Sequence, residues 1–385
     1  MPNRISEFLR ERIDAGDFPS AVYLVAEKGE IVLQDAIGYA VVEPERIEAK
    51  VDTIYDLASL TKVLVTGLLI AQMVERELIG LDDDIVRLLS TSRKDSQRLA
   101  LRDLLTHTSG YERWKPFYLL EGAPQFDLDD YGCSSYNNNR IREFIKDEIL
   151  KLKPHRQPKK VVYGDLNFLL LGFLLELLHG YPLLTIQLDE ITSRLMLQRT
   201  LYCGGGPSRE TAASEKGNEY ERDLCQELFP QHRTPHSAFR TQTIWGEVHD
   251  GNAYFMGGVA GHAGLFSTAE EVFKIAQQFL PNYTTLLKPE TCQLFCTNYT
   301  KGMNEDRSFA FQLASTPEST AGSKMSPESF GHVGFTGTSL WIDPVKERIF
   351  ILLTNRTHDH ALPFVNINSV RRKFHDLAID LLEKN

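Results

Sequence analysis

The sequence contains few cysteines, and they follow no recognisable pattern. They are five in number, none belongs to a Cys-x-x-Cys pair, and their spacing is irregular. A disulfide-stapled fold would need a higher density of paired cysteines, and a zinc site would need matched ligand spacing. We therefore expect free thiols in a reducing compartment at all five positions: Cys133, Cys203, Cys225, Cys292 and Cys296.

Positive charge is also in short supply. Lys and Arg together number 42 against 52 Asp and Glu, which gives a formal net charge of −10 at pH 7. Proteins that bind nucleic acid normally carry a basic face, and the basic stretch 154–160 is too short to form one. The composition therefore argues against a nucleic-acid partner. With 42% hydrophobic residues it is otherwise that of an ordinary globular protein.

No apolar run is long enough to cross a membrane. The most apolar stretch, 168–178, is short and is interrupted by Glu176. Near the N-terminus, apolar residues recur at helical spacing among Arg and Glu: Ile5, Phe8, Leu9 and Ile13. This pattern predicts an amphipathic helix rather than a leader sequence. We therefore expect a cytoplasmic protein without a membrane partner.

Signatures of other hydrolase classes are missing as well. The sequence has no Gly-x-Ser-x-Gly, which α/β-hydrolases use to present their nucleophile, and no His-Glu-x-x-His. The glycine-rich stretch 257–267 lacks the spacing of a phosphate-binding loop, so its glycines are expected to allow close packing or tight turns. We expect neither a metal nor a cofactor. Five histidines could be imagined as metal ligands, of which the last two are expected to be solvated: His249, His262, His332, His358 and His360.

Strand-like segments lie at both ends of the chain. Residues 21–26 and 31–36 flank the turn-rich tetrapeptide 27–30, which predicts a β-hairpin. Near the other end, four strand-like stretches precede a closing amphipathic helix: 309–313, 332–335, 338–342, 349–354 and the helix 369–382. The economical arrangement is an α+β fold, in which an antiparallel sheet assembled from both ends is flanked by the N- and C-terminal helices.

The middle of the chain is predicted to form an inserted helical domain. Periodic apolar residues predict three of its helices: 64–78, 141–152 and 166–178. The aromatic stretch 111–139 could cap a core or wall a pocket, and 202–252 shows too little periodicity to predict anything but a long loop. The predicted division is a discontinuous sheet domain, 1–66 and 269–385, and a helical domain with long loops, 67–268.

One stretch places a hydroxyl and an amine where a helix is expected to begin. Ser59 and Lys62 lie three residues apart at the start of an apolar pattern, so they would share one helix face about one turn apart. An amine beside an alcohol can support nucleophilic chemistry when its pKa is lowered or its proton is shared. A Ser-x-x-Lys is nevertheless expected about once by chance in such a chain, so the motif needs a context.

Two further short motifs follow Ser59-Leu-Thr-Lys62 along the chain: Tyr163-Gly-Asp165 and His332-Val-Gly334. Their succession resembles the Ser-x-x-Lys, Tyr-x-Asn and Lys-or-His-x-Gly motifs of the serine β-lactamase and penicillin-binding superfamily. The branch that the chain most resembles holds class C β-lactamases, D-alanyl-D-alanine peptidases and family VIII carboxylesterases. Four longer stretches extend the resemblance from about Phe18 to Asn355: 18–32, 104–110, 261–268 and 331–338.

The resemblance implies a role for each of these residues. Ser59 would be the nucleophile, and either Lys62 or Tyr163 would take its proton. Which of the two is the base stays open, because coupled groups titrate as a unit. The backbone N–H groups of Ser59 and Phe335 would form the oxyanion hole, which the tetrahedral intermediate needs. Gly334 would let its strand approach the substrate closely.

Two substrate-binding positions depart from the class C pattern. Asp165 stands where an Asn is usual, and a carboxylate can only accept hydrogen bonds, whereas an amide can also donate. His332 stands where a Lys is usual, and a histidine is mostly neutral near pH 7. Both changes favour a neutral ester over a β-lactam or a peptide carboxylate. We therefore predict a serine hydrolase that cleaves short-chain carboxylic esters through an acyl-Ser59 intermediate, with little β-lactamase activity.

Other activities use the same residues and stay open as alternatives. They are a β-lactamase or D-amino-acid peptidase, a penicillin-binding sensor that acylates without turnover, and a transacylase. Some peptidases of the superfamily use His-x-Gly, so His332 alone does not separate these activities. The expected partner is a small-molecule ester. The sequence leaves the natural substrate, its acyl-chain length and a homo-oligomeric state open.

Overall fold

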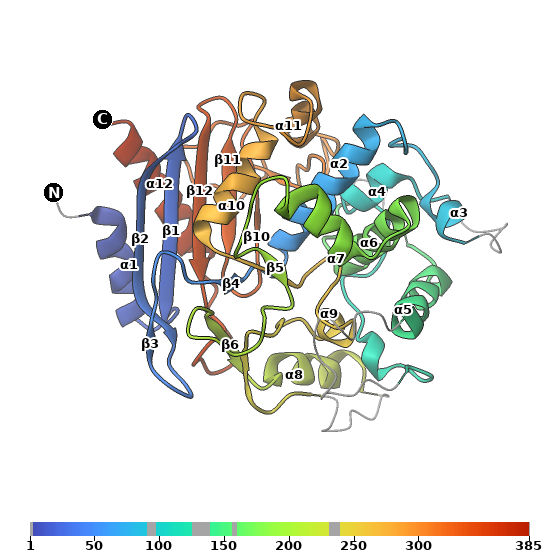
Figure 1. The fold of residues 1–385 in the computed structure, drawn as a ribbon, viewed down its shortest axis with the longest axis horizontal. Coiled ribbons are helices and arrows are strands. Elements are labelled where there is room, and N and C mark those ends of the chain that lie inside the picture. Colours follow the sequence, from blue (N-terminus) through green and yellow to red (C-terminus); the bar gives the residue numbers. More distant parts are fainter. Residues whose placement is uncertain (1–2, 91–97, 125–138, 156–159, 231–238, 385) are drawn as a thin grey trace.

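The computed structural model of the chain describes residues 3–90, 98–124, 139–155, 160–230 and 239–384 (Figure 1). A seven-stranded antiparallel sheet has the strand order β3-β2-β1-β12-β11-β10-β9. Three of its strands come from the start of the chain: β1 (Ser20–Glu27), β2 (Glu30–Val41) and β3 (Ile47–Glu48). The others come from its end: β9 (Gln312–Leu313), β10 (Phe330–Val333), β11 (Ser339–Asp343) and β12 (Arg348–Thr354). The predicted sheet, assembled from both ends, is confirmed.

The pairing of β1 with β12 joins the two ends of the chain at the centre of the sheet. The register runs from Ala21 opposite Thr354 to Glu27 opposite Arg348. Both strands are buried along nearly their whole length. Strands covered on both faces are apolar at most positions, which is why these two carry continuous rather than alternating hydrophobic residues.

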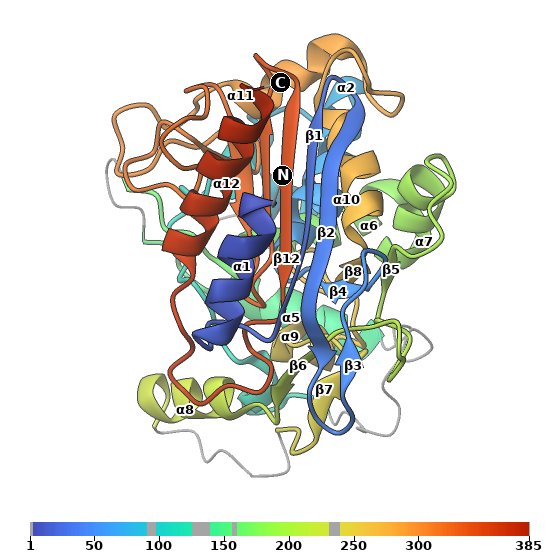
Figure 2. The ribbon, with the colours of Figure 1, turned by 90° about the vertical axis from the view of Figure 1, so that its left-hand side faces the viewer.

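The terminal helices α1 (Arg4–Asp14) and α12 (Asn368–Leu382) pack side by side on one face of the sheet (Figure 2). Leu9 and Phe374 from these helices share a buried cluster with Tyr23 of β1, and the Tyr23 and Phe374 ring centroids lie 5.8 Å apart. Helix α10 (Ala269–Ala276) contacts β1 and β12 from the other face. The predicted flanking of the sheet by the terminal helices is therefore confirmed.

The helical part is organised around α6 (Asp165–His179), whose residues from Leu166 to Leu175 are all buried. Four helices pack against it besides α2 (Leu68–Glu75): α3 (Ile85–Leu89), α4 (Leu101–Leu105), α5 (Asn139–Lys151) and α7 (Leu183–Gln187). The glycine-rich stretch 257–267 crosses α6 closely. A Cβ at Gly261 would lie 2.2 Å from the carbonyl oxygen of Phe168, so the predicted close packing at these glycines is confirmed.

The helix predicted over 64–78 differs in form and extent. Residues Lys62–Gly67 form a π-helical segment, and the α-helix α2 that follows ends at Glu75. Such widened turns are rare and often lie at functional sites. Here the widened turn begins at Lys62, so it bears directly on how that side chain is presented.

The prediction of a long loop over 202–252 is wrong for the residues that the structure describes. They include helices and short strands: β5 (Leu201–Tyr202), β6 (Ala213–Lys216), α8 (Glu219–Leu228), β7 (Thr243–Trp245) and α9 (Gly251–Phe255). The strands are too short to show periodicity. They are held by partners distant in sequence, as when β8 (Leu265–Ser267) pairs with both β5 and β4 (Tyr55–Asp56).

Every strand of the large sheet lies within 1–66 or 269–385. The segment between them forms one small sheet from β6 and β7, and its strands β5 and β8 form another with β4 from the first part of the chain. The domain division itself stays a prediction. Within the described ranges no single helix is long and apolar enough to cross a membrane; α6 and the helical run Leu183–Thr192 reach that threshold only as a pair, bent by 79°. The four cysteines that the structure describes are free, as predicted, and Cys133 lies outside the described residues.

Candidate active site

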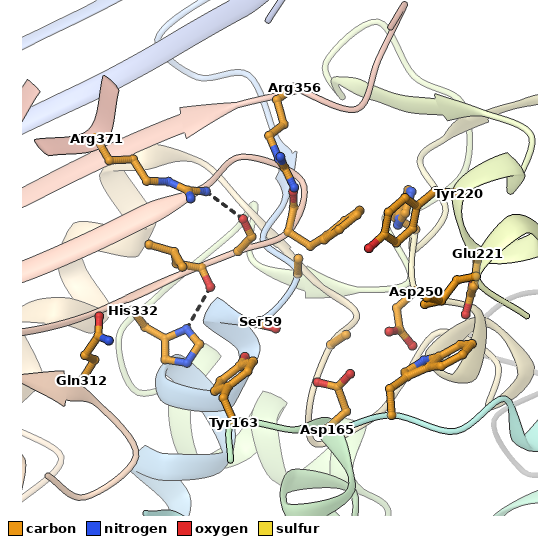
Figure 3. Close-up of a pocket in the computed structure, with 18 of the residues that line it drawn as sticks. Ser59, Tyr163, Asp165, Tyr220, Glu221, Asp250, Gln312, His332, Arg356 and Arg371 are labelled. Carbon is orange, nitrogen blue, oxygen red and sulfur yellow. Dashed lines mark hydrogen bonds between the residues drawn. The ribbon is translucent and has the colours of Figure 1, made fainter. Parts of the chain in front are cut away.

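A pocket of about 510 Å³ gathers the motif residues from distant parts of the chain (Figure 3). Six of the seven predicted site residues line it: Ser59, Tyr163, Asp165, His332, Gly334 and Phe335. The seventh, Lys62, is fully buried beside Ser59. In Figure 3, Ser59 lies between the strand that carries His332 and the helix that carries Tyr220 and Glu221. The structure thus brings all of the predicted residues together.

Three oxygen atoms surround the Lys62 ammonium. Its Nζ donates to Ser59 Oγ at 2.8 Å and to the His262 carbonyl oxygen at 3.0 Å, and it lies 2.7 Å from Asp165 Oδ1. An ammonium has three donors and no acceptor, so this environment satisfies the charged form completely. The i to i+3 spacing read from the sequence therefore does place the amine against the hydroxyl.

The pKa of Lys62 is raised above its ordinary value. Burial alone would lower it, but the Asp165 carboxylate and the neighbouring Tyr163 outweigh burial. Lys62 is therefore a cation, and a cation cannot accept the proton of Ser59. Its charge can instead stabilise negative charge on the groups beside it.

Tyr163 lies in a cluster of aromatic and cationic side chains. Its ring centroid is 4.6 Å from that of His107 and 5.5 Å from that of His332, and the Arg307 guanidinium lies 5.2 Å away. The ammonium of Lys62 is 5.4 Å from the same ring. Within the described part of the chain, the buried Tyr163 hydroxyl forms no hydrogen bond. This hydroxyl is therefore free to exchange a proton with a group in the pocket.

The two residues predicted to form the oxyanion hole both line the pocket. Among the described residues, neither the Ser59 nor the Phe335 N–H donates to a protein acceptor, as an oxyanion hole requires. A Cβ at Gly334 would lie 2.6 Å from the Leu57 carbonyl oxygen and 2.1 Å from Thr338 Oγ1. Only glycine therefore lets the strand approach the Ser59 segment so closely.

The segment that presents Ser59 is tied to the turn between β10 and β11. Thr336 Oγ1 donates to the Asp56 carbonyl oxygen at 2.7 Å, and Thr338 Oγ1 donates to that of Leu57 at 3.0 Å. Ala58, just before Ser59, has a φ of 47°, a left-handed conformation that is uncommon for a residue with a side chain. These bonds hold the strained corner in place and fix the position of the hydroxyl.

The two departures from the class C pattern have distinct surroundings. Asp165 starts α6, lines the pocket and pairs with Lys62, so its carboxylate is engaged before any substrate arrives. His332 bonds the Val333 carbonyl oxygen through Nδ1 at 2.9 Å, and within the described residues its buried Nε2 has no partner. Burial, followed by the charges of Arg307 and Lys62, lowers the pKa of His332 well below its ordinary value. His332 therefore presents a neutral acceptor to the pocket.

Several pocket residues gave no sequence signal. Tyr220, Glu221 and Leu224 come from α8, which lies in the segment predicted to be a loop. Burial, with the nearby Asp250 charge added, raises the pKa of Glu221 to about 8. Trp114 also lines the pocket, so the aromatic stretch does contribute to its wall, although Phe126, Tyr131 and Tyr136 lie outside the described residues.

Asp250 lines the pocket and pairs with the buried His262. His262 Nε2 lies 2.9 Å from Asp250 Oδ1, and this contact outweighs burial and holds the pKa of Asp250 well below its ordinary value. Ligand atoms of Asp165, Asp250 and His262 all lie within 4.8 Å of one another. A metal could be held there by distance alone. However, His262 Nε2 is already bonded to Asp250, and the Lys62 ammonium supplies a positive charge at Asp165.

The expectation that His358 is solvated is wrong. The side chain is buried, its Nε2 accepts from the Val42 N–H at 2.8 Å, and its Nδ1 bonds the Ser214 carbonyl oxygen at 2.8 Å. The turn is polar in sequence, but it is covered by segments distant along the chain. His358 therefore ties that turn to its neighbours.

Fold and site together define the class of the protein. An antiparallel sheet is flanked by the terminal helices and has the Ser-x-x-Lys pair beside it, and the sequence matches the model of the Beta-lactamase family over residues 5–371. The chain belongs to the beta-lactamase family and is a serine hydrolase of that family. It is 28% identical over 379 residues to a protein of Escherichia coli (strain K12) named "Putative D-alanyl-D-alanine carboxypeptidase". That match covers 92% of this chain and 82% of the relative.

Solved structures share the fold. EstCE1, "a hydrolase with promiscuous acyltransferase activity", has a TM-score of 0.69 and 19% identity, with 97% of each chain covered. A class C beta lactamase from Rhodobacter sphaeroides has a TM-score of 0.68 and 16% identity, with 99% of each chain covered. An octameric penicillin-binding protein homologue from Pyrococcus abyssi has a TM-score of 0.70 and 18% identity over 98% of this chain and 77% of that one. At these identities the likeness is one of fold.

Proposed function

We propose that this protein is a serine esterase that cleaves short-chain carboxylic esters through an acyl-Ser59 intermediate. The observation that carries the proposal is the contact of Ser59 Oγ with a Lys62 ammonium that Asp165 keeps charged, in a pocket where His332 is neutral. A carboxylate-bearing substrate would need a free cation at the His332 position. A neutral ester needs only the nucleophile, a base and an oxyanion hole.

In this proposal Tyr163 is the base, because Lys62 is already protonated. Ser59 Oγ bonds to the ester carbonyl carbon as its proton passes to the Tyr163 phenolate, whose charge the Lys62 cation stabilises. The N–H groups of Ser59 and Phe335 bind the resulting oxyanion. The carbon–oxygen bond to the alcohol then breaks, and the alcohol leaves with the proton from Tyr163. Water repeats the sequence on the acyl-Ser59 ester and releases the acid.

The ion pair of Asp165 with Lys62 supports the prediction that β-lactamase activity is weak. An asparagine could donate its amide N–H to the side-chain carbonyl of a β-lactam, whereas a carboxylate would face that oxygen with a negative charge. The pocket wall contributed by Trp114, Tyr220, Leu224 and Phe335 is largely apolar. It suits the hydrocarbon part of an ester.

A D-amino-acid peptidase is the second candidate, and one observation favours it. Arg307, Arg356 and Arg371 all line the pocket on the side of His332 or Phe335. Each guanidinium is already bonded: Arg307 to Glu305, Arg356 to the Phe335 and Val365 carbonyl oxygens, and Arg371 to those of Gly334 and Thr338. We therefore place the ester first and the peptidase second.

A substrate panel separates the two candidates. We expect turnover of p-nitrophenyl acetate and butyrate with a kcat/KM at least about 100-fold above that for a chromogenic cephalosporin or a peptide ending in D-alanyl-D-alanine. A discrimination of this size corresponds to about 2.7 kcal/mol in transition-state binding. Cephalosporin or peptide turnover above ester turnover would overturn the proposal. An ester burst followed by a near-zero steady state would replace it with an acylating sensor.

Replacing Asp165 with asparagine should move the alkaline limb of activity to lower pH. In the native protein the carboxylate helps to raise the pKa of Lys62 against burial. Without the carboxylate, burial dominates, so Lys62 loses its proton, and Tyr163 its stabilising charge, at a lower pH. We expect a shift of about 1 to 3 pH units in the kcat/KM profile. Asp165→Glu, which keeps the charge, is the control; an unmoved limb in Asp165→Asn would contradict the role given to the ion pair.

We also propose a cytoplasmic location, a small-molecule ester as the partner and no nucleic-acid or membrane partner. The four free cysteines support a reducing compartment. Fractionation of cells that express the protein checks the location. A homo-oligomer is a further proposal, suggested by the octameric homologue of the same fold; light scattering on the purified protein measures it.

A further inference from the structure

The motif Leu104–Gly110 has no part in the chemistry described so far, yet its histidine binds the backbone on both sides of Tyr163. The Val162 N–H donates to the His107 carbonyl oxygen at 2.9 Å, and the Gly164 N–H donates to His107 Nδ1 at 3.3 Å. We propose that His107 is a positioning residue for Tyr163. This inference rests on the proposed function, in which Tyr163 is the base.

The tautomer of His107 follows from its partners. Nδ1 accepts from the Gly164 N–H and lies 3.0 Å from Asn167 Nδ2, so Nδ1 carries the lone pair and Nε2 carries the proton. The side chain is 1% exposed. Burial, followed by the charge of Arg307, lowers the pKa of His107 well below its ordinary value. The ring therefore stays neutral, and the acceptor for the Gly164 N–H is always present.

A buried chain of side chains holds His107 in turn. Ser109 Oγ donates to Asn167 Oδ1 at 2.5 Å, and Asn167 is fully buried in the first turn of α6. The Asn167 amide is thereby oriented so that its nitrogen faces His107. The His107 ring packs against Tyr163, with ring centroids 4.6 Å apart. Ring and backbone of Tyr163 are thus fixed by the same residue.

The backbone of His107 makes this double contact possible. Its φ is 57°, in the left-handed region that asparagine, aspartate and histidine adopt more readily than other side chains. The carbonyl oxygen bonds Val162 and the ring bonds Gly164, the two residues on either side of Tyr163. Misplacement of a reacting group by about 1 Å can cost about 100-fold in rate, so loss of these contacts should lower the rate measurably.

Two substitutions of His107 test the proposal. His107→Phe keeps an aromatic ring and the backbone carbonyl but removes the Nδ1 acceptor. His107→Asn restores an acceptor and tolerates the positive φ. We expect His107→Phe to lower kcat for p-nitrophenyl butyrate, and the rate at which a fluorophosphonate probe labels Ser59, by roughly 10- to 100-fold. KM should stay within about twofold, and His107→Asn should recover most of the loss.

A matched control comes from His375, a fully buried histidine of α12 whose Nδ1 bonds the Thr320 carbonyl oxygen at 2.8 Å. His375→Phe should leave kcat and the rate of Ser59 labelling unchanged, even if it lowers the melting temperature as much as His107→Phe does. In a Tyr163→Phe background, His107→Phe should cause no further loss, because the two residues act through one group. An equal loss in that background, or a loss in His375→Phe as large as in His107→Phe, would overturn the proposal.

The fluorophosphonate probe tests the role of His107 independently of the proposed ester substrate. Labelling forms a bond from Ser59 Oγ to phosphorus and expels fluoride, so it reports activation of the serine without an ester. A native protein that is labelled but hydrolyses no ester refutes the ester function, and the His107 comparison then still decides the positioning role. A native protein that shows neither labelling nor hydrolysis refutes both.

Discussion

Ser59→Ala should abolish the acyl-enzyme and lower kcat for ester hydrolysis by a factor on the order of 10⁶, the size of loss seen when a serine hydrolase loses its nucleophile. The substitution removes the hydroxyl that accepts a hydrogen bond from the Lys62 ammonium at 2.8 Å. The oxyanion N–H groups and the rest of the pocket stay, so residual activity should reflect binding and polarisation of the ester alone. Intact-protein mass spectrometry after mixing with p-nitrophenyl butyrate or the fluorophosphonate measures the adduct directly.

The fold should tolerate this change. Ser59 is partly exposed, and Lys62 keeps its contacts with Asp165 and the His262 carbonyl oxygen. Loss of one hydrogen bond to a charged group costs about 1.5 to 3 kcal/mol. Ser329→Ala, at a fully buried serine before β10, is the matched control and should keep full activity. An adduct on any residue other than Ser59, or turnover that survives Ser59→Ala, would refute the assignment of the nucleophile.

The nucleophile and the amine beside it could be predicted from the sequence because their relation is local. Three residues of helix-like backbone place Lys62 Nζ against Ser59 Oγ wherever that stretch is located in the fold. The hairpin of β1 and β2 was predictable for the same reason, since a turn-rich tetrapeptide between apolar runs determines its own pairing. The order of the three motifs then predicted that Tyr163 and His332 would join them.

The charge state of the site could not be predicted in this way. Whether Lys62 is an amine or an ammonium depends on burial and on Asp165, which is far along the chain and meets Lys62 only in the folded protein. From the sequence, Asp165 was predicted to contact the substrate, whereas in the structure its carboxylate is paired with Lys62. From the sequence, Asp165 was expected to alter substrate specificity. In the folded protein its main contact is with Lys62, so it alters the protonation of the catalytic groups instead.

The pocket wall escaped prediction for a related reason. The strands around helix α8 are short, and they are stabilised by contacts with segments distant in sequence rather than by their own periodicity. Helix α8 itself has ten residues, which is long enough for a helical pattern to be recognised. The isolated bridge between Ile54 and Thr211 ties this segment to the strand that leads to Ser59. Sequence periodicity reports how an element buries one face, and elements of two to five residues are too short to show it.

Tyr163→Phe should lower ester hydrolysis by about 10² to 10⁴, the usual contribution of a general base, without destabilising the protein. The ring is kept, so the contacts with His107, His332 and Arg307 remain. Only the hydroxyl is lost. It is buried and, within the described part of the chain, unpartnered, and such a group costs stability rather than adding it. The free energy of unfolding should therefore stay constant or rise by up to about 1 kcal/mol.

Opposite movements of activity and stability would distinguish a catalytic tyrosine from a structural one. A core tyrosine with a satisfied hydroxyl would lose stability on substitution and leave kcat nearly unchanged, whereas Tyr163 should do the reverse. Steady-state kinetics and thermal unfolding of the same preparations measure both quantities. Near-native kcat in Tyr163→Phe would return the role of base to Lys62. Because its environment holds Lys62 charged, that outcome would require the ion pair with Asp165 to break during the reaction. Asp165→Asn would then raise activity at neutral pH, since it lowers the pKa of Lys62, whereas under the tyrosine mechanism the same variant loses activity as the pH rises.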